Sequence, residues 1–250
     1  MDVYWLEQVE GDVPPNDDWL SASEAACLAR MRFAKRRADW RLGRWTAKCA
    51  VSEYLGLQRR PAAVEIRAAP SGAPEVYLDS QAARVTISLS HRAGRAVCAV
   101  THCGAALGCD LELVEPRSSA FAADYFTTRE QLLVASAAPD CRDELLTLLW
   151  SGKESALKAL GEGLRLDTRC VTVSLVGAED MPDLDAWRPL QAACESGRIF
   201  DGWWRRTGDM VRTMVAAPAP DPPIGLCREQ SPTPRFGGLK HQLVAGLHRM

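Results

Sequence analysis

The sequence predicts an α/β (α+β) protein built from two similar halves. Runs with helical periodicity alternate with short runs in which apolar and polar residues alternate, and clusters of turn residues separate them. The same order of helices followed by strands occurs twice along the chain. This order suggests an internal duplication, although no repeat of individual residues proves it.

The first half, residues 1–104, is expected to begin with a strand over residues 3–7. Ser21 and Glu24 have the spacing of a capping box, so a helix should begin there. A second helix should continue to about Leu55, because Pro61 then ends the helical pattern. The remaining expected elements are strands at 64–67, 85–89 and 95–101, and a turn at 70–74.

The second half, residues 105–217, is expected to begin with a strand over residues 105–114. A helix should start near Thr128, and a longer helix should follow over residues 143–160, where Gly161 suits a helix C-cap. The remaining expected elements are strands near 170–176, 198–206 and 209–217.

The tail, residues 218–250, follows both halves. Six of the fifteen prolines lie between residues 216 and 234, and each proline removes a backbone donor, so we expect an extended path here. Leu239, Leu243 and Leu247 form a short amphipathic pattern that could dock as a helix. The motifs discussed below all lie upstream of the tail. A chain that ends near Pro220 should therefore still fold, with docking of the tail on the first half as the alternative.

Composition limits the class of protein. The chain has 250 residues, of which 47% are hydrophobic and 25% charged, as in ordinary globular proteins. A formal net charge of −2 gives no electrostatic reason to expect nucleic acid or an anionic membrane as a partner. Nine cysteines without a C-x-x-C pair predict reduced thiols, and no apolar run approaches about 18 residues. We expect a cytoplasmic protein.

The longer helix of the second half carries an unusual pair of charges. Glu154 and Lys158 lie one helical turn apart in an otherwise apolar and small-residue run, and Trp150 lies one turn before Glu154. An exposed i,i+4 pair that supports the helix is the simple interpretation. A bulky aromatic residue beside a carboxylate can instead exclude water and strengthen its electrostatic interactions.

The strand over residues 105–114 carries two carboxylates. Alternation places Asp110 and Glu112 on one face of this strand, where they repel each other. A divalent cation would remove that cost, and Mg²⁺ typically takes one or two carboxylates together with phosphates and waters. With Glu154 and Lys158 the set resembles a metal–phosphate site, while a half-exposed acidic strand remains the alternative.

Two further groups could bind anions. Ser90, His91 and Arg92 stand at the end of an apolar strand, where a hydroxyl, an imidazole and a guanidinium can bind phosphate or serve a structural role. Basic residues also recur at helical spacing in the first half, and they could form either a solvated face or an anion-binding wall. They are Arg37, Arg41, Arg44 and Lys48.

Taken in order, these motifs resemble those of the Sfp-type 4′-phosphopantetheinyl transferases over roughly residues 33–215. The most specific element is W-x-x-K-E-x-x-x-K downstream of G-x-D-x-E. The segments that carry the resemblance are Gly72-Ala73-Pro74, Leu89-Ser90-His91, Gly108-Cys109-Asp110-Leu111-Glu112, Phe126-Thr127, Trp150-Ser151-Gly152-Lys153-Glu154-Ser155-Ala156-Leu157-Lys158 and Gly161-Glu162-Gly163-Leu164.

The resemblance implies a pseudo-dimer of two α/β halves with the active site at their interface. Coenzyme A would be held there with Mg²⁺, or Mn²⁺, on its pyrophosphate. It further implies transfer of phosphopantetheine to a serine of an acyl or peptidyl carrier protein by a monomer that needs neither nucleic acid nor membrane. The other product would be adenosine 3′,5′-bisphosphate.

The resemblance also implies roles for single residues. Asp110, Glu112 and Glu154 would be metal ligands, and Glu154 would also be the base for the carrier serine. Lys158 would be catalytic and would meet the phosphate under attack. The implied coenzyme contacts are Lys35, Arg36, Gly72, Ala73, Pro74, Ser90, His91, Arg92 and Lys158.

Two positions depart from the family's pattern, and two other classes of protein remain. Ala73 stands where the family often has lysine, so only a backbone contact is expected there. Arg92 replaces a small polar residue and could supply a charged contact. A catalytically inactive module that binds coenzyme A or a carrier protein is one alternative. A metal-dependent nuclease is less well supported, because Leu113 follows Glu112 where such sites generally carry a lysine.

Overall fold

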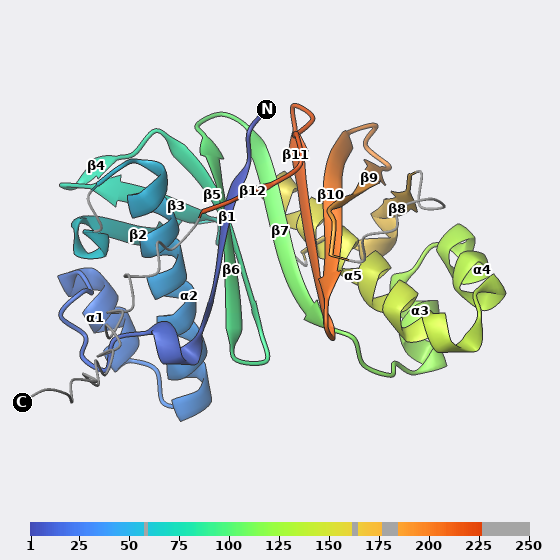
Figure 1. Ribbon diagram of the computed structural model, residues 1–250, viewed down its shortest axis with the longest axis horizontal. Helices are drawn as coiled ribbons and strands as arrows, with labels where there is room; N and C mark the ends of the chain where they lie inside the picture. Colours follow the sequence, from blue (N-terminus) through green and yellow to red (C-terminus); the bar gives the residue numbers. More distant parts are fainter. Residues whose placement is uncertain (58–59, 162–164, 177–184, 227–250) are drawn as a thin grey trace, which may run out of the picture.

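The computed structural model describes residues 1–57, 60–161, 165–176 and 185–226, and it confirms the mixed α and β content. Figure 1 shows two halves side by side, with strands of each half meeting at the centre of the molecule and helices toward the outside. Across the described ranges, no helix combines the length and the apolar character needed to cross a membrane.

The first half consists of two small sheets with one long helix packed against them. The strand orders are β12-β1-β6-β5 and β2-β3-β4. The long helix buries Ala47, Ala50 and Val51 in an apolar cluster with Leu6 and Cys98. The elements of this half are β1 (Tyr4–Val9), α1 (Ala22–Ala29), α2 (Ala34–Tyr54), β2 (Val64–Ala68), β3 (Pro74–Leu78), β4 (Gln81–Ala82), β5 (Val85–Arg92) and β6 (Arg95–His102).

The second half is one five-stranded antiparallel sheet, in the order β7-β11-β10-β9-β8, again with one long helix against a face. Leu149 and Ala156 of that helix are fully buried, as an apolar helix face packed on a sheet requires. The elements of this half are β7 (Ala106–Leu113), α3 (Ser119–Tyr125), α4 (Thr128–Ser136), α5 (Arg142–Leu160), β8 (Val171–Leu175), β9 (Arg188–Cys194), β10 (Ile199–Thr207) and β11 (Met210–Ala217).

Four of these elements, β3, β4, α3 and β9, are additional to those expected from the sequence. Pro74 and Pro189 weakened the strand pattern, because proline cannot donate to a ladder. Pro74 is the first residue of β3, where a missing donor is tolerated. The third element, α3, spans only seven residues, too few to show helical periodicity.

The topology repeats between the halves. The order β1-β6-β5 in the first half corresponds to β7-β11-β10 in the second, and β2 and β3 correspond to β8 and β9. Both α2 and α5 end at a glycine with positive φ, Gly56 at 64° and Gly161 at 76°. The structure therefore supports the duplication that the order of elements suggested.

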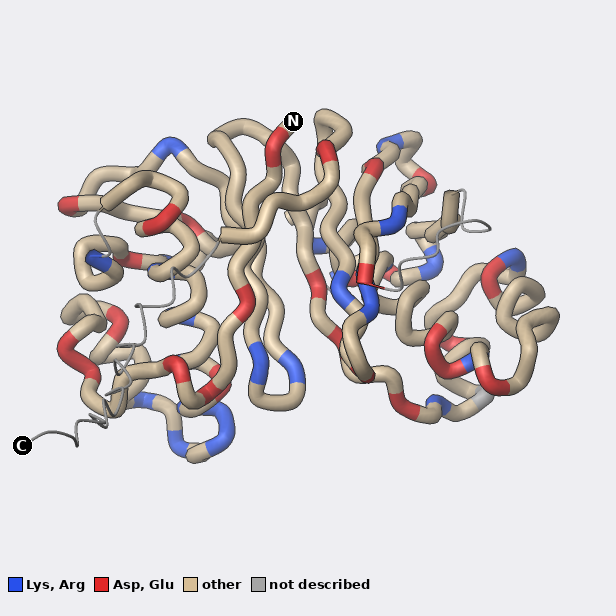
Figure 2. Tube along the Cα trace, in the orientation of Figure 1, with Lys and Arg blue, Asp and Glu red and all other residues tan. Residues whose placement is uncertain are grey.

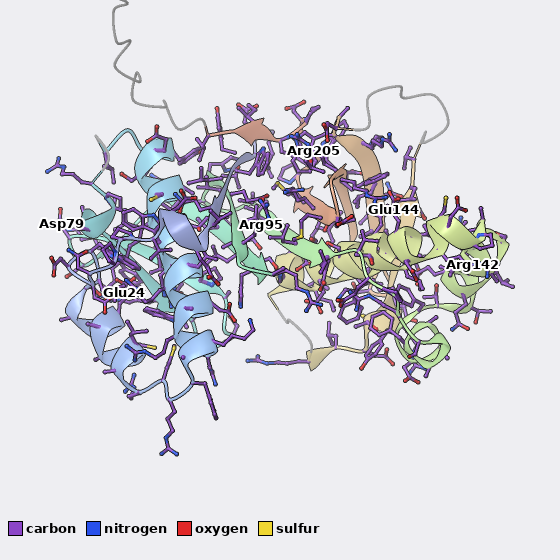
Figure 3. All side chains as sticks on the ribbon, turned by 60° about the horizontal axis from the view of Figure 1, so that its bottom comes forward. Glu24, Asp79, Arg95, Arg142, Glu144 and Arg205 are labelled. Carbon is purple, nitrogen blue, oxygen red and sulfur yellow. The ribbon has the colours of Figure 1, made fainter. Side chains whose placement is uncertain are left out.

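A buried ion pair is repeated with the topology. In the first half, Glu24 lies 2.7 Å from the Lys48 ammonium of α2, and its other oxygen accepts from the backbone N–H of Ile66 in β2 at 3.0 Å. Glu24 also completes a capping box with Ser21. Figure 3 labels Glu24, which lies well inside the first half, far from the second.

The second half contains the same arrangement. Glu130 lies 2.8 Å from the Lys153 ammonium of α5, accepts from the N–H of Val173 in β8 at 2.9 Å, and completes a capping box with Thr127. Both lysine side chains have 0% exposure. Lys153, although part of the W-x-x-K-E motif, therefore ties α4 and β8 to α5 inside the core.

The boundary between the halves is formed mainly by strands. Val97 and Ala99 of β6 pack against Leu107, Cys109 and Leu111 of β7 in one buried cluster. A bidentate ion pair crosses the same boundary, because Glu7 of β1 accepts from two guanidinium nitrogens of Arg212 in β11 at 2.5 and 2.8 Å. Arg95, labelled in Figure 3, also donates to Glu7 at 3.1 Å.

The beginning of the tail returns to the first half. β12 (Ile224–Gly225) pairs in parallel with β1, the Asp221 carboxylate lies 3.1 Å from the N-terminal ammonium, and the Trp203 indole donates to Pro220 O at 3.0 Å. Residues 224–225 are extended, as predicted, and they also pair with β1, because neither of them is a proline. The amphipathic pattern at 236–250 lies outside the described residues.

Candidate active site

A cavity of about 560 Å³ lies between the two halves. Its walls come from α2, the β2–β3 turn and β5 of the first half, and from residues 105–107 and the C-terminal end of α5 in the second. Both halves are needed to enclose it. Lys158 and His91 lie in its lining. The predicted carboxylates Asp110, Glu112 and Glu154 are not part of the lining, and Asp110 adjoins it through its ion pair with Lys158.

Gly108 sets the position of Asp110. A Cβ at Gly108 would lie 1.7 Å from the backbone oxygen of Ser155, so only glycine lets β7 pass this close to α5. Asp110, two residues on, consequently faces α5 and is 4% exposed. Its Oδ1 accepts from the Lys158 ammonium and from the Ser90 hydroxyl, both at 2.8 Å. Its Oδ2 is buried and has no hydrogen-bond partner among the described residues.

Glu112 lies on the same face of β7, as alternation predicted. Its carboxylate accepts from the Trp150 indole at 3.1 Å and from Arg117 at 3.3 Å, and the Arg92 guanidinium lies 3.6 Å away. Burial and then the charge of Asp110 raise the pKa of Glu112, and the two arginines oppose that rise. Trp150 thus contacts a carboxylate, but the residue is Glu112 rather than Glu154.

The charge of Asp110 shifts the pKa values of both Glu154 and Lys158. Burial, with the charges of Asp110 and Glu112, raises the pKa of Glu154 to about 7, and Lys158 opposes the rise. Burial alone would lower the pKa of Lys158, but the nearby Asp110 reverses the direction and the pKa is raised. The simple interpretation of an exposed helix pair is therefore wrong, because these two groups are coupled to the carboxylates of β7.

The predicted metal ligands are Asp110, Glu112 and Glu154. Among the described residues, no three His, Cys, Asp or Glu side chains form a group that could hold a metal ion by themselves. However, Oδ2 of Asp110 is buried without a described hydrogen-bond partner, and burial followed by the charge of Asp110 raises the pKa values of Glu112 and Glu154. These features fit an open Mg²⁺ site that takes few protein ligands and completes its shell from a substrate.

The predicted coenzyme contacts fall into two groups. Gly72, Ala73, Pro74 and His91 line the cavity with Lys158. Ser90 is outside the lining and donates to Asp110. Burial lowers the pKa of His91, and Lys158 and Lys35 act in the same direction against Asp39 and Asp110.

The other group lies outside the lining. Figure 2 shows basic residues gathered where the chain enters α2, and Lys35 and Arg36 are exposed there. The Lys35 side chain is 84% exposed and pairs with Asp39 at 2.9 Å. Arg92 binds Glu115 and lies beside Glu112, so its charge is directed at carboxylates.

The basic face of α2 proves to be largely structural. Arg37 donates to Leu28 O at 2.6 Å, Arg41 donates to Pro14 O at 2.6 Å, and Lys48 is the buried partner of Glu24. Arg44 differs, because it lines the cavity, its Nε is buried without a described hydrogen-bond partner, and burial lowers its pKa. Helical spacing alone could not distinguish Arg44 from its neighbours.

Arg67 is a further basic residue that the motifs did not indicate. It lines the cavity, its guanidinium lies 4.0 Å from the centre of the Tyr77 ring, and it pairs with Glu65 at 2.6 Å. The alternating charges of β2 gave no sign that this face borders a cavity.

Comparison with known proteins agrees with this geometry. Residues 106–182 match the profile of the 4′-phosphopantetheinyl transferase superfamily. The chain is 29% identical over 189 residues to the 4′-phosphopantetheinyl transferase HetI of Nostoc sp., covering 74% of this chain and 78% of that protein. The chain is thus similar to the 4′-phosphopantetheinyl transferase superfamily. The matched segment contains Asp110, Glu112, Glu154 and Lys158, so the superfamily profile and the charged cluster coincide.

A solved structure of a related transferase also shows a partial likeness. It is the holo-[acyl-carrier-protein] synthase of Helicobacter pylori in complex with coenzyme A, at 19% identity and a TM-score of 0.28. The likeness covers 40% of this chain and 98% of that one. A score this low does not establish a common fold.

Proposed function

We propose that this protein transfers the 4′-phosphopantetheine group of coenzyme A to a serine hydroxyl of an apo carrier protein, acyl or peptidyl, and releases adenosine 3′,5′-bisphosphate. The observation that carries the proposal is the ion pair between Asp110 and Lys158, because it joins the carboxylates Asp110, Glu112 and Glu154 to a lysine that lines a cavity enclosed by both halves. The match of residues 106–182 to the superfamily profile and the likeness to HetI support the same reaction.

Glu154 is the proposed base. With its pKa raised to about 7, a substantial fraction is deprotonated at neutral pH while the group keeps a high proton affinity. It accepts the proton of the carrier serine as the serine oxygen attacks the phosphorus that bears the pantetheine arm. The bond from that phosphorus to the bridging oxygen breaks, and the electron pair leaves with adenosine 3′,5′-bisphosphate.

Lys158 is the proposed cationic partner of the phosphate. Its ammonium is fixed by Asp110 Oδ1 and by Cys109 O at 3.0 Å, so it is held in place before the substrate arrives. A positioned cation stabilises the charge that develops on the phosphate oxygens. We propose that Asp110, Glu112 and Glu154 hold Mg²⁺, or Mn²⁺, which would offset further negative charge on the pyrophosphate.

The remaining walls serve binding in this proposal. His91 and Ser90 would contact phosphate, the 72–74 turn would line the adenine through its backbone, and Arg44 would meet an anionic group of the coenzyme. Lys35, Arg36 and Arg92 are proposed coenzyme contacts as well, reached from outside the cavity lining. One chain supplies both walls of the cavity, and we therefore propose that the active unit is a monomer.

Mass spectrometry of the carrier tests the function directly. The protein, coenzyme A and Mg²⁺ are incubated with several apo carrier proteins, and the expected product is a carrier heavier by one phosphopantetheine group. Glu154→Gln should remove most of that product while the fold is kept, because an amide cannot accept the proton. Coenzyme A binding without any modified carrier would favour the inactive-module alternative and contradict the proposal.

A further inference from the structure

The loop of residues 69–73 forms one rim of the cavity. It contains a β-turn in which Gly72 N–H donates to Ala69 O at 2.8 Å, with Pro70 at the second position. Ala69 N–H donates to Ala73 O at 2.8 Å, and Ala73 N–H donates to the Ser71 hydroxyl at 3.3 Å. The loop therefore uses the carbonyls of Ala69 and Ala73 for its own folding.

The next two carbonyls accept from the other half of the molecule. The Arg165 guanidinium, in the segment that follows α5, donates to Ser71 O at 3.0 Å and approaches Pro70 O at 3.5 Å. A single guanidinium thus meets two adjacent carbonyl oxygens across the boundary between the halves. Both contacts come from the same terminal nitrogen of Arg165, so they tie the loop to the second half at one point.

The position of this loop matters for the cavity. Ser71 and Gly72 line one side, and Leu160 and Gly161 at the end of α5 line the other. Neither Gly72 nor Ala73 has a side chain that can reach a ligand, so any contact from these two residues must come from the backbone. A backbone contact cannot adjust by changing rotamer. Its strength depends on where the whole loop is held.

We propose that Arg165 is a positioning residue that holds the 69–73 loop at the coenzyme pocket across the boundary between the halves. This inference rests on the proposed function, because it assumes that the cavity takes coenzyme A. Arg165 acts through the loop and need not touch the substrate. Its loss should weaken coenzyme binding and leave the transfer step intact once the coenzyme is bound.

The test compares Arg165→Ala, Arg165→Lys and the control Arg169→Ala. Arg169 is an exposed arginine four residues later that pairs with Asp167, and it makes no contact with the loop. For Arg165→Ala we expect the KM for coenzyme A and the calorimetric Kd to rise about three- to tenfold, as suits a charged hydrogen bond near the surface. The kcat, the KM for the carrier and the thermal midpoint should stay unchanged. Arg165→Lys should recover part of the loss, and Arg169→Ala should match wild type.

A second substrate separates positioning from direct contact. With 3′-dephospho-coenzyme A, the loss of a loop support should raise the KM by the same factor as with coenzyme A. A loss confined to coenzyme A would mean that Arg165 binds the 3′-phosphate directly and would overturn the proposal. An unchanged KM and Kd in a folded Arg165→Ala variant would overturn it as well. Wild-type protein that neither binds nor consumes coenzyme A would instead contradict the proposed function.

Discussion

Replacing Lys153 by methionine should destabilise the protein and leave its chemistry intact. The Lys153 ammonium has 0% exposure and makes three polar contacts, to Glu130 at 2.8 Å, to Thr168 O at 3.0 Å and to Val171 O. Methionine fills a similar volume but leaves the Glu130 carboxylate buried without its counter-charge. Removing one partner of a buried ion pair costs about 3–5 kcal/mol. For a chain of this length that corresponds to a fall in the thermal midpoint of about 6–20 °C.

Differential scanning calorimetry and single-turnover transfer, measured well below the new midpoint, separate the two effects. The chain offers its own control, because Lys48→Met removes the equivalent cation from the first half, remote from the carboxylates of β7. We expect both variants to lose similar stability and to keep most of the transfer rate. Lys158→Met should instead lose most of the transfer rate, in addition to the stability lost when Asp110 is left without its counter-charge. A folded Lys153→Met protein with wild-type stability and no transfer would refute the structural role of Lys153.

Three further predictions concern pH, coenzyme binding and the tail. Because the pKa of Glu154 is raised to about 7 in the folded protein, the folded state binds the proton more tightly than the unfolded state does. In metal-free protein, the contribution of Glu154 to the free energy of unfolding should be full below about pH 4.5 and should be lost as pH rises through 7. Glu154→Gln should flatten this pH dependence of the thermal midpoint. Arg44→Ala should raise the KM for coenzyme A about tenfold with kcat unchanged, since the guanidinium faces the cavity without an ion pair in the described structure. The same KM in the variant and in wild type would place Arg44 outside the binding site. A chain ending at Pro220 loses β12 and the contact of Asp221 with the N-terminus, so its thermal midpoint should fall while transfer persists. A stable but inactive truncated protein would show instead that the tail completes the active site.

Short-range rules predicted the parts of the site that depend on one element. Strand alternation placed Asp110 and Glu112 on one face, and helical spacing placed Glu154 and Lys158 one turn apart, as the structure has them. The contact between Ser90 and Asp110 joins two strands that share no ladder, so no periodicity could reveal it. The role of Lys153 likewise depends on Glu130, which lies on another helix.

One signal in the sequence could have revealed more. Trp45-Thr46-Ala47-Lys48 and Trp150-Ser151-Gly152-Lys153 differ only by small substitutions, and each follows a capping box whose glutamate binds the lysine. Comparing the helices at this register would have shown the residue-level repeat and assigned Lys153 a partner. Arg44 has no such signal, because its turn of α2 faces the cavity only through packing against β5 and the 69–73 loop.

The duplication has a consequence for where chemistry can occur. Both halves contain a hairpin with a two-residue turn, Ala93-Gly94 and Gly208-Asp209, so the strand registers of the halves can be superimposed. In that superposition Leu6 and Gln8 of β1 occupy the places of Asp110 and Glu112.

The long helices extend the correspondence. Aligning Lys48 with Lys153 places Cys49 where α5 has Glu154. Gln8 is 2% exposed, and neither polar atom of its side chain has a hydrogen-bond partner in the described structure. The two halves have therefore diverged into unequal roles. Both contain the buried ion pair that supports the fold, but only the second half has the acidic groups. The first half contributes the other wall of the shared cavity.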